Sequence, residues 1–142
     1  MKTVKQMLQL KGGAVYSVTP QTMVFDALKL MAEKNIGAVL VLADGKVTGI
    51  VTERDYARKV ILFGKSSRDI AVSEIMSDKV LTVQTAQTVE ECMALMTNKR
   101  IRHLPVMDGE KLVGLLSIGD LVKEVIAEQE LTIKQLESYI HR

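Results

Sequence analysis

The sequence lacks the marks of several protein classes. It contains a single cysteine, so no disulfide framework can form, and a reducing compartment such as the cytoplasm is expected. No apolar run approaches the roughly 20 residues that a membrane-spanning helix needs. The charged N-terminus, Met1–Lys5, is followed by no signal-peptide core. The net charge of +2 is too small to indicate a nucleic-acid partner by itself. A cytoplasmic protein is therefore predicted.

Signs of catalysis are equally scarce. The two histidines, His103 and His141, lie far apart, and no Cys/His spacing suggests a metal site. No pair of acidic residues stands out as general acid and base. A Gly-rich phosphate loop and a dinucleotide fingerprint are both missing. We therefore expect neither an enzyme nor a metal cofactor, and we expect Cys92 to be inert packing.

What the chain does contain is an internal repeat. The second copy follows the first at an offset of 65 residues, so Tyr16 aligns with Leu81. Residues 16–61 align with residues 81–126 without a gap. Matched positions include Val18 and Val83, Val41 and Val106, Gly49 and Gly114, and Asp55 and Asp120. These matches include an acid and a glycine as well as apolar residues, so composition alone is a poor explanation. A weaker echo lies upstream, where residues 4–8 resemble residues 72–76.

Each copy predicts the same series of elements, βαββα. A short extended stretch precedes an amphipathic helix, whose apolar face is formed by Val24, Ala27, Leu28 and Met31 in the first copy. A buried strand, a tight turn, a second strand and a closing helix follow. The strands are expected at 38–42 and 47–51, then at 104–107 and 112–116, and the closing helices near 53 and 118.

Local signals refine these boundaries. Thr88 with Glu91 forms a capping box for the helix of the second copy, whereas Thr22 is the expected cap in the first copy. Asp44-Gly45 and Asp108-Gly109 predict the hairpin turns, which need positive φ. A further capping box, Thr132 with Gln135, predicts the start of a separate last helix.

One copy has too few elements to cover its own sheet, so two copies are expected to pack face to face as one pseudo-twofold α/β domain. The predicted segments are an N-terminal helical segment (1–15), the first repeat (16–62), a linker with a lead-in helix (63–76), the second repeat (77–127) and a C-terminal helix (128–142).

The sharpest motif ends each copy, as GIVTERD at residues 49–55 and GLLSIGD at residues 114–120. Both place a hydroxyl where a strand ends and an aspartate three residues later. One interpretation is a helix cap, because Ser or Thr at the N-cap satisfies free backbone N–H groups. The other is a binding site, because the hydroxyl and the helix start can hold a phosphate and the aspartate can accept hydrogen bonds from ribose hydroxyls. The two roles can coexist.

A basic stretch precedes the buried strand of the second copy, in the sequence RIRHLPV at residues 100–106. Arg100 is explained by the favourable interaction of a cation with a helix C-terminus. Arg102 and His103 are less well explained in this way, and arginine is suited to phosphate contacts. The first copy has Gly37 and Ala38 at these positions, so the two sites are expected to differ.

The duplicated unit and these motifs resemble a tandem pair of CBS domains, also called a Bateman module, and the layout is similar to stand-alone bacterial CBS-domain proteins. The resemblance implies a regulatory module that binds an adenine nucleotide in clefts between the repeats, with AMP or NAD(H) favoured, and that forms a homodimer. It implies one site from Thr52, Asp55, Thr82, Ile101, Arg102 and His103, and another from Ser117, Ile118, Asp120, Ser17, Ile36, Gly37 and Ala38. Arg54 would reach phosphate from either cleft.

Two other hypotheses remain open from the sequence. In the first, the module is a ligand-free dimerisation scaffold whose hydroxyl–aspartate motifs only cap helices. In the second, less favoured, it binds nucleic acid through the basic residues Arg58, Lys59, Lys65 and Arg68. The adenine nucleotide itself, and the protein that is regulated, are not specified by the sequence.

Overall fold

The computed structural model describes residues 2–141, which form two compact units. The first-repeat unit is continuous and runs from Val15 to Leu81. The second-repeat unit combines the N-terminal segment, up to Ala14, with the chain from Thr82 onward. Each repeat is thus completed by a segment from outside its own core sequence.

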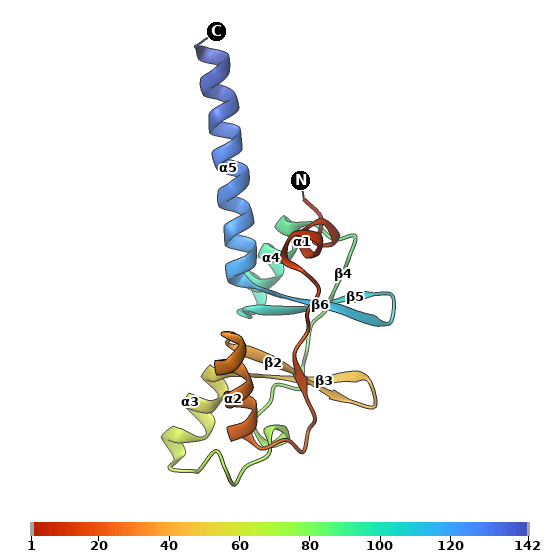
Figure 1. Cartoon of the computed structure of the whole chain (residues 1–142), viewed down its shortest axis with the longest axis vertical. Helices are drawn as coiled ribbons and strands as arrows, with labels where there is room; N and C mark the ends of the chain where they lie inside the picture. The colour runs from red at the N-terminus through yellow and green to blue at the C-terminus, as the bar shows by residue number, and fades with distance from the viewer. Residues whose placement is uncertain (1, 142) are drawn as a thin grey trace. The chain divides into compact units, whose positions relative to one another are not determined.

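The first-repeat unit is built on a three-stranded mixed sheet of order β1-β2-β3 (Figure 1). β1 is parallel to β2, and β2 is antiparallel to β3. Its elements are β1 (Ser17–Val18), α2 (Val24–Lys34), β2 (Ala38–Ala43), β3 (Lys46–Thr52), α3 (Glu53–Lys59) and short 3-10 turns at Ile61–Phe63 and Val72–Glu74.

The second-repeat unit has the same topology, with sheet order β4-β5-β6. Its elements are α1 (Val4–Lys11), β4 (Val83–Gln84), α4 (Val89–Lys99), β5 (His103–Asp108), β6 (Lys111–Ser117) and α5 (Ile118–Ile140). The predicted α/β class, the two βαββα repeats and the additional C-terminal helix are therefore confirmed. α5 also serves as the closing helix of its repeat.

The predicted helix faces form the two cores. In α2, Val24, Ala27 and Met31 are at most 2% exposed and lie in one cluster with Val39 and Val41 of β2. In α4, the equivalent buried positions are Val89 and Cys92, together with Met96. Burial raises the pKa of the Cys92 thiol to about 11, with a smaller contribution from Glu91, so this thiol is protonated at neutral pH.

The similar segments at residues 4–8 and 72–76 pack in the same way, each against one repeat. Val72 donates its backbone N–H to Thr22 O at 2.8 Å, and Val4 donates to Gln87 O at the same distance. In return, the first residue of each repeat helix donates to the lead-in segment: Val24 N–H to Ile70 O, and Val89 N–H to Lys2 O. The lead-in residues Val72 and Val4 are both fully buried. α1 therefore covers the second repeat in the way that residues 70–77 cover the first.

The repeated glycine is explained by this lead-in packing. A Cβ on Gly49 would lie 2.5 Å from Met76 Sδ and 2.9 Å from Ser77 O. A Cβ on Gly114 would lie 2.6 Å from a methyl group of Leu8. At Gly49 a side chain would therefore meet the backbone of the lead-in chain, whereas at Gly114 it would meet only the flexible end of Leu8.

Three local expectations are corrected by the structure. The N-cap of α2 is Met23, without a side-chain cap, because linker carbonyls of Ile70 and Ser67 accept the first helical N–H groups while Thr22 Oγ1 accepts from Thr19 N–H. The second hairpin turn is Gly109-Glu110, because Asp108 pairs with Lys111. No helix starts at Thr132, whose hydroxyl donates to Glu128 O inside the continuous α5.

Candidate functional site

The hydroxyl–aspartate motif caps the closing helix in both repeats. In the first, Asp55 N–H donates to Thr52 Oγ1 at 3.1 Å, and Thr52 N–H donates to Asp55 Oδ2 at 2.9 Å. In the second, Asp120 N–H donates to Ser117 Oγ at 3.2 Å, and Ser117 N–H donates to Asp120 Oδ2 at 2.8 Å. These reciprocal bonds are capping boxes. The capping interpretation is therefore confirmed, and the capping bonds engage only Oδ2 of each aspartate.

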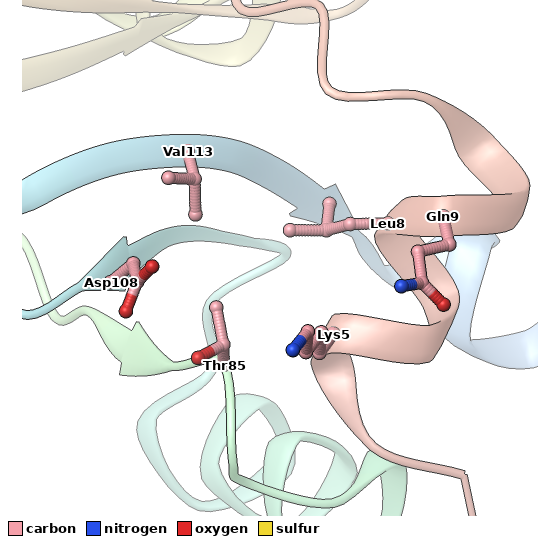
Figure 2. Close-up of a pocket in the computed structure, with 6 residues that line it drawn as sticks. All are labelled: Lys5, Leu8, Gln9, Thr85, Asp108 and Val113. Atoms are coloured by element: carbon pink, nitrogen blue, oxygen red, sulfur yellow. The ribbon is translucent and has the colours of Figure 1, made fainter.

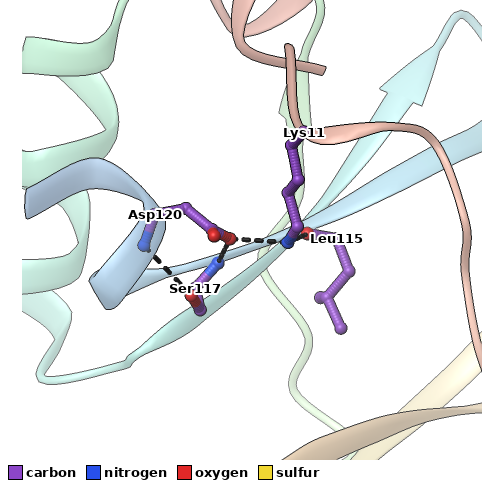
Figure 3. A network of polar contacts seen from close by, with 4 residues as sticks. All are labelled: Lys11, Leu115, Ser117 and Asp120. Atoms are coloured by element: carbon purple, nitrogen blue, oxygen red, sulfur yellow. Dashed lines mark hydrogen bonds and ion pairs between the residues drawn. The ribbon is translucent and has the colours of Figure 1, made fainter. Parts of the chain in front are cut away.

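A lysine that sequence reasoning missed lies against the second aspartate. Lys11 Nζ is 2.5 Å from Asp120 Oδ2 and donates to Leu115 O at 2.6 Å (Figure 3). Lys11 is in the last turn of α1, so the contact spans most of the chain. No pattern in the sequence marks this residue, because the echo at residues 4–8 does not say which repeat the segment covers.

The first aspartate has a looser cationic neighbour. Lys59, one turn later on α3, is 3.4 Å from Asp55 Oδ1 and donates to Ile75 O at 2.9 Å. The position equivalent to Lys59 in α5 is Glu124, which pairs with Lys2 Nζ at 2.7 Å. The second repeat therefore binds its N-terminal segment to α5 through two ion pairs one turn apart, at Asp120 and Glu124.

The titratable groups at this end of the second repeat influence one another. Burial by itself would raise the pKa of Asp120, but hydrogen bonds from Lys11 and Ser117 outweigh burial and leave this pKa lowered. The pKa of His103 is also lowered, first by burial and then by the charges of Lys11 and Arg102, against an opposing effect of Asp120. His103 is therefore neutral at pH 7.

Each repeat brings the start of its middle strand beside the start of its closing helix. Ala38 pairs with Thr52 across β2 and β3, and Glu53 N–H donates to Gly37 O at 3.0 Å. In the second repeat, His103 pairs with Ser117, and Ile118 N–H donates to Arg102 O at 2.8 Å. Within each repeat, the predicted site residues at the start of the middle strand are thus adjacent to those at the start of the closing helix.

The remaining predicted residues differ in exposure. Ser17 on β1, Thr82 just before β4, Arg54 on α3 and Arg102 before β5 are all exposed. Ile36, Gly37, Ile101, His103 and Ile118 are half-buried, and Ala38 is buried. The pairing of residues from one repeat with those of the other stays a prediction.

A separate hollow lies in the second-repeat unit, between α1 and the sheet (Figure 2). It has a volume of about 310 Å³ and is open. Its lining consists of Lys5, Leu8, Gln9, Thr85, Asp108 and Val113, and it includes none of the predicted site residues.

Two further kinds of feature are missing from the described part of the chain. Between residues 2 and 141, no group of three or more His, Cys, Asp or Glu residues is arranged to hold a metal ion. Over the same part of the chain, no helix has both the length and the apolar character required to cross a membrane.

Comparison with known proteins shows the family to which this chain belongs. The CBS domain model matches residues 13–61 and 72–127. The mitochondrial CBS domain-containing protein CBSX3 of Arabidopsis thaliana is 38% identical, over 97% of this chain and 71% of the relative.

Two solved structures share the fold. A CBS-domain protein from Burkholderia ambifaria MC40-6 is 57% identical, with a TM-score of 0.86, over 90% of this chain and 96% of the other. The CBS domain pair of protein MJ0100, in complex with 5′-methylthioadenosine and S-adenosyl-L-methionine, has a TM-score of 0.80 at 23% identity, over 90% and 98% of the two chains. The two matched segments, the repeated sheets and the duplicated capping motif place this chain in the CBS domain family, as a protein with two CBS repeats in tandem.

Proposed function

We propose that the protein is a non-enzymatic regulatory module that binds an adenine nucleotide in clefts between its two CBS repeats. The main support is that each capping aspartate accepts the capping hydrogen bond with Oδ2, so that Oδ1 takes no part in the cap. A carboxylate held in this way can cap a helix and accept a hydrogen bond from a ribose hydroxyl at the same time. Asp55 and Asp120 are thus the proposed ribose acceptors.

The other predicted residues supply the remaining contacts. Thr52 and Asp55 would act with Thr82, Ile101, Arg102 and His103 of the second repeat. Ser117, Ile118 and Asp120 would act with Ser17, Ile36, Gly37 and Ala38 of the first repeat. Arg102 and Arg54 are exposed guanidinium groups suited to phosphate, whereas the small residues Gly37 and Ala38 offer none. AMP or NAD(H) is the proposed ligand class.

The family supports this proposal in outline. The CBS domain pair of MJ0100 holds adenosyl compounds, so the fold can accept an adenine nucleoside. Regulation further requires that the ligand bind two states of the module with different affinity. We also propose a homodimer and a reducing location such as the cytoplasm, the latter from the unpaired, buried Cys92.

Calorimetric titration and thermal melting with AMP, ATP, NAD, NADH and S-adenosylmethionine test the proposal. Ligand at 100 times its Kd should add about 2.7 kcal/mol to the free energy of unfolding. Asp55→Asn and Asp120→Asn keep a capping oxygen but remove the charge, so each should weaken binding at its site by about tenfold or more.

Asp26→Asn provides the matched control. Asp26 occupies the first turn of α2, as the site aspartates do in their helices, but it belongs to no proposed site. It should leave binding unchanged. Should none of the nucleotides bind or shift the melting temperature, the ligand-free scaffold is the better description. Tight, salt-sensitive DNA binding would instead favour the nucleic-acid hypothesis.

A further inference from the structure

The second half of α5 has no packing partner within the described chain. In the first turns of the helix, Leu121 is fully buried and Glu124 is 9% exposed. From Gln129 to His141 every residue is exposed. This half extends away from α1 and α4 of the same unit (Figure 1). A helix that ends without tertiary contacts gains no stability from packing, which is the main source of helix stability in proteins.

An apolar stripe runs along this exposed part of the helix. Successive members are separated by four and three residues in alternation, which is the a/d spacing of a heptad repeat. The stripe consists of Val122, Ile126, Gln129, Ile133, Leu136 and Ile140. Apart from Gln129, its members are apolar side chains that are 40–74% exposed. The stripe therefore has the spacing of a coiled-coil seam.

We propose that this stripe binds the same stripe of a second copy of the chain, as a short parallel two-stranded coiled coil. The a positions are all isoleucine and the d positions include Val122 and Leu136. Within parallel coiled coils, β-branched residues at a with leucine at d favour two strands, and Leu136 is the one leucine among the three d positions. This interface lies beyond the CBS repeats and does not depend on nucleotide binding.

Gln129 selects the parallel arrangement. In a parallel pair, each d residue faces its own copy, so the two Gln129 amides can hydrogen-bond to each other. In an antiparallel pair, d residues face a residues, so Gln129 would lie against an isoleucine and lose a hydrogen-bond partner. A single polar pair in the seam also fixes its register.

The flanking charges agree with this choice. In the parallel pair, Glu130 lies beside the partner's Val125 and Glu137 lies beside the partner's Thr132, so no like charges meet. In the antiparallel pair that aligns the full stripe, Glu130 would face its own copy, and like charges directly opposite each other are unfavourable. A second copy in the parallel arrangement thus brings no like charges together along the seam.

The seam is short, at about 27 Å for residues 122–140. The first turn of an isolated helix is costly to form, because it fixes several residues for a single hydrogen bond. Here the first turns of α5 are already fixed by burial of Leu121 and by the Lys2–Glu124 ion pair. The CBS unit therefore supplies the nucleus from which the seam extends.

Sedimentation analysis of the full chain tests the interface. We expect a dimer at micromolar concentration for the wild type, and at least a tenfold weaker dimer for Ile133→Glu, which places a charge in the seam. Leu131→Glu is the matched control, because Leu131 is 58% exposed on the same helix but lies off the stripe. It should stay dimeric. A monomeric wild type, or equal dimer strength for both variants, would overturn the proposal.

Cysteine cross-linking tests the orientation. Gln129→Cys should form a covalent dimer on mild oxidation, because each copy faces itself, whereas Ser138→Cys on the opposite face should not. The native Cys92 is buried and its thiol is protonated at neutral pH, so it gives no background. A Gln129→Cys variant that cross-links no faster than Ser138→Cys would refute the parallel seam.

Discussion

Asp55 and Asp120 make the same capping bonds but differ in the lysine that accompanies each. Lys59 comes from the same helix as Asp55 and lies at 3.4 Å. Lys11 comes from α1 and lies at 2.5 Å from Asp120. The ion pair of Asp120 therefore depends on the position of the N-terminal segment, whereas the ion pair of Asp55 does not. This difference leads to two predictions.

The first concerns stability and pH. Lys11→Met should lower the free energy of unfolding at pH 7 by up to about 1 kcal/mol, as expected for a partly exposed ion pair. The lowered pKa of Asp120 contributes stability above the pKa of an unfolded aspartate, about 3.9, and this contribution is lost as the pH falls through the folded value. The difference from wild type should therefore shrink at pH 3. Urea unfolding at both pH values measures it.

Lys29→Met is the control for this experiment, because Lys29 is an exposed lysine in α2. It should have little effect at either pH. If Lys11→Met cost the same at pH 3 as at pH 7, the lysine would stabilise the protein through its methylene chain rather than through Asp120.

The second residue-scale prediction concerns His103. Removing the charge of Lys11 should raise the pKa of His103, and Asp120→Asn should lower it further, because the two charges act on the imidazole in opposite directions. NMR titration checks both shifts, with His141→Gln in the background to leave one imidazole signal. Because the folded pKa is depressed, protonation favours the unfolded chain and stability should fall as the pH drops through about 6.5. Shifts of the same sign in both variants would contradict this account.

At the scale of elements, the repeated glycines allow a graded test. Gly114→Ala should destabilise by about 1–3 kcal/mol, because the new methyl group meets the flexible end of Leu8. Gly49→Ala should cost more, because it also meets the backbone oxygen of Ser77, which is less free to move. Chemical denaturation gives both values.

Companion variants separate the side-chain clash from other effects. Leu8→Ala should reduce the cost of Gly114→Ala in a double-mutant cycle, because it removes the clashing methyl groups. Met76→Ala should rescue Gly49→Ala only in part. Full rescue of Gly49→Ala would show that the Ser77 carbonyl is not a real obstacle.

The elements were largely predictable because the signals that define them are local. Apolar spacing gave α2 and α4, and the capping boxes at Thr52, Ser117 and Thr88 marked helix starts correctly. Thr22 and Thr132 show the limit of such signals. α2 is capped by linker carbonyls distant in sequence, and the Thr132–Gln135 pattern lies inside a helix already propagating from Ser117.

The candidate site was predictable only in its repeated parts. Duplication revealed the aspartates, because both copies carry them at one spacing, whereas the residues before the middle strands share only Ile36 and Ile101. Lys11 occurs in no repeated pattern at the site, and its contact with Asp120 depends on tertiary packing of α1. A single sequence contains no periodicity that encodes such a contact.

At the scale of the whole molecule, the two units should differ in their dependence on the N-terminal segment. A fragment of residues 15–81 keeps every residue of its core cluster and should retain a cooperative unfolding transition. A fragment of residues 82–142 lacks the fully buried Val4 and the 5% exposed Met7, each of which contributes about 1.5–3 kcal/mol by burial. It should be much less stable. Circular dichroism melts compare the two fragments.

Reattaching the missing segment is the decisive control. Residues 2–14 joined to residues 82–142 by a flexible linker should restore cooperative melting, and the Val4→Asp version of that fusion should not. An 82–142 fragment that melts as sharply as the fusion would mean that α1 is dispensable for the second core.

The split composition of the second-repeat unit also bears on how the chain is made. Residues 2–14 leave the ribosome before the first-repeat unit, yet their binding surface on β6 and α4 emerges only after that unit. The first-repeat unit can collapse during translation, since all its strands are then available. The amphipathic N-terminal helix, by contrast, must wait in the nascent chain with Val4 and Met7 exposed until its core partners, from Val83 to Leu121, have emerged.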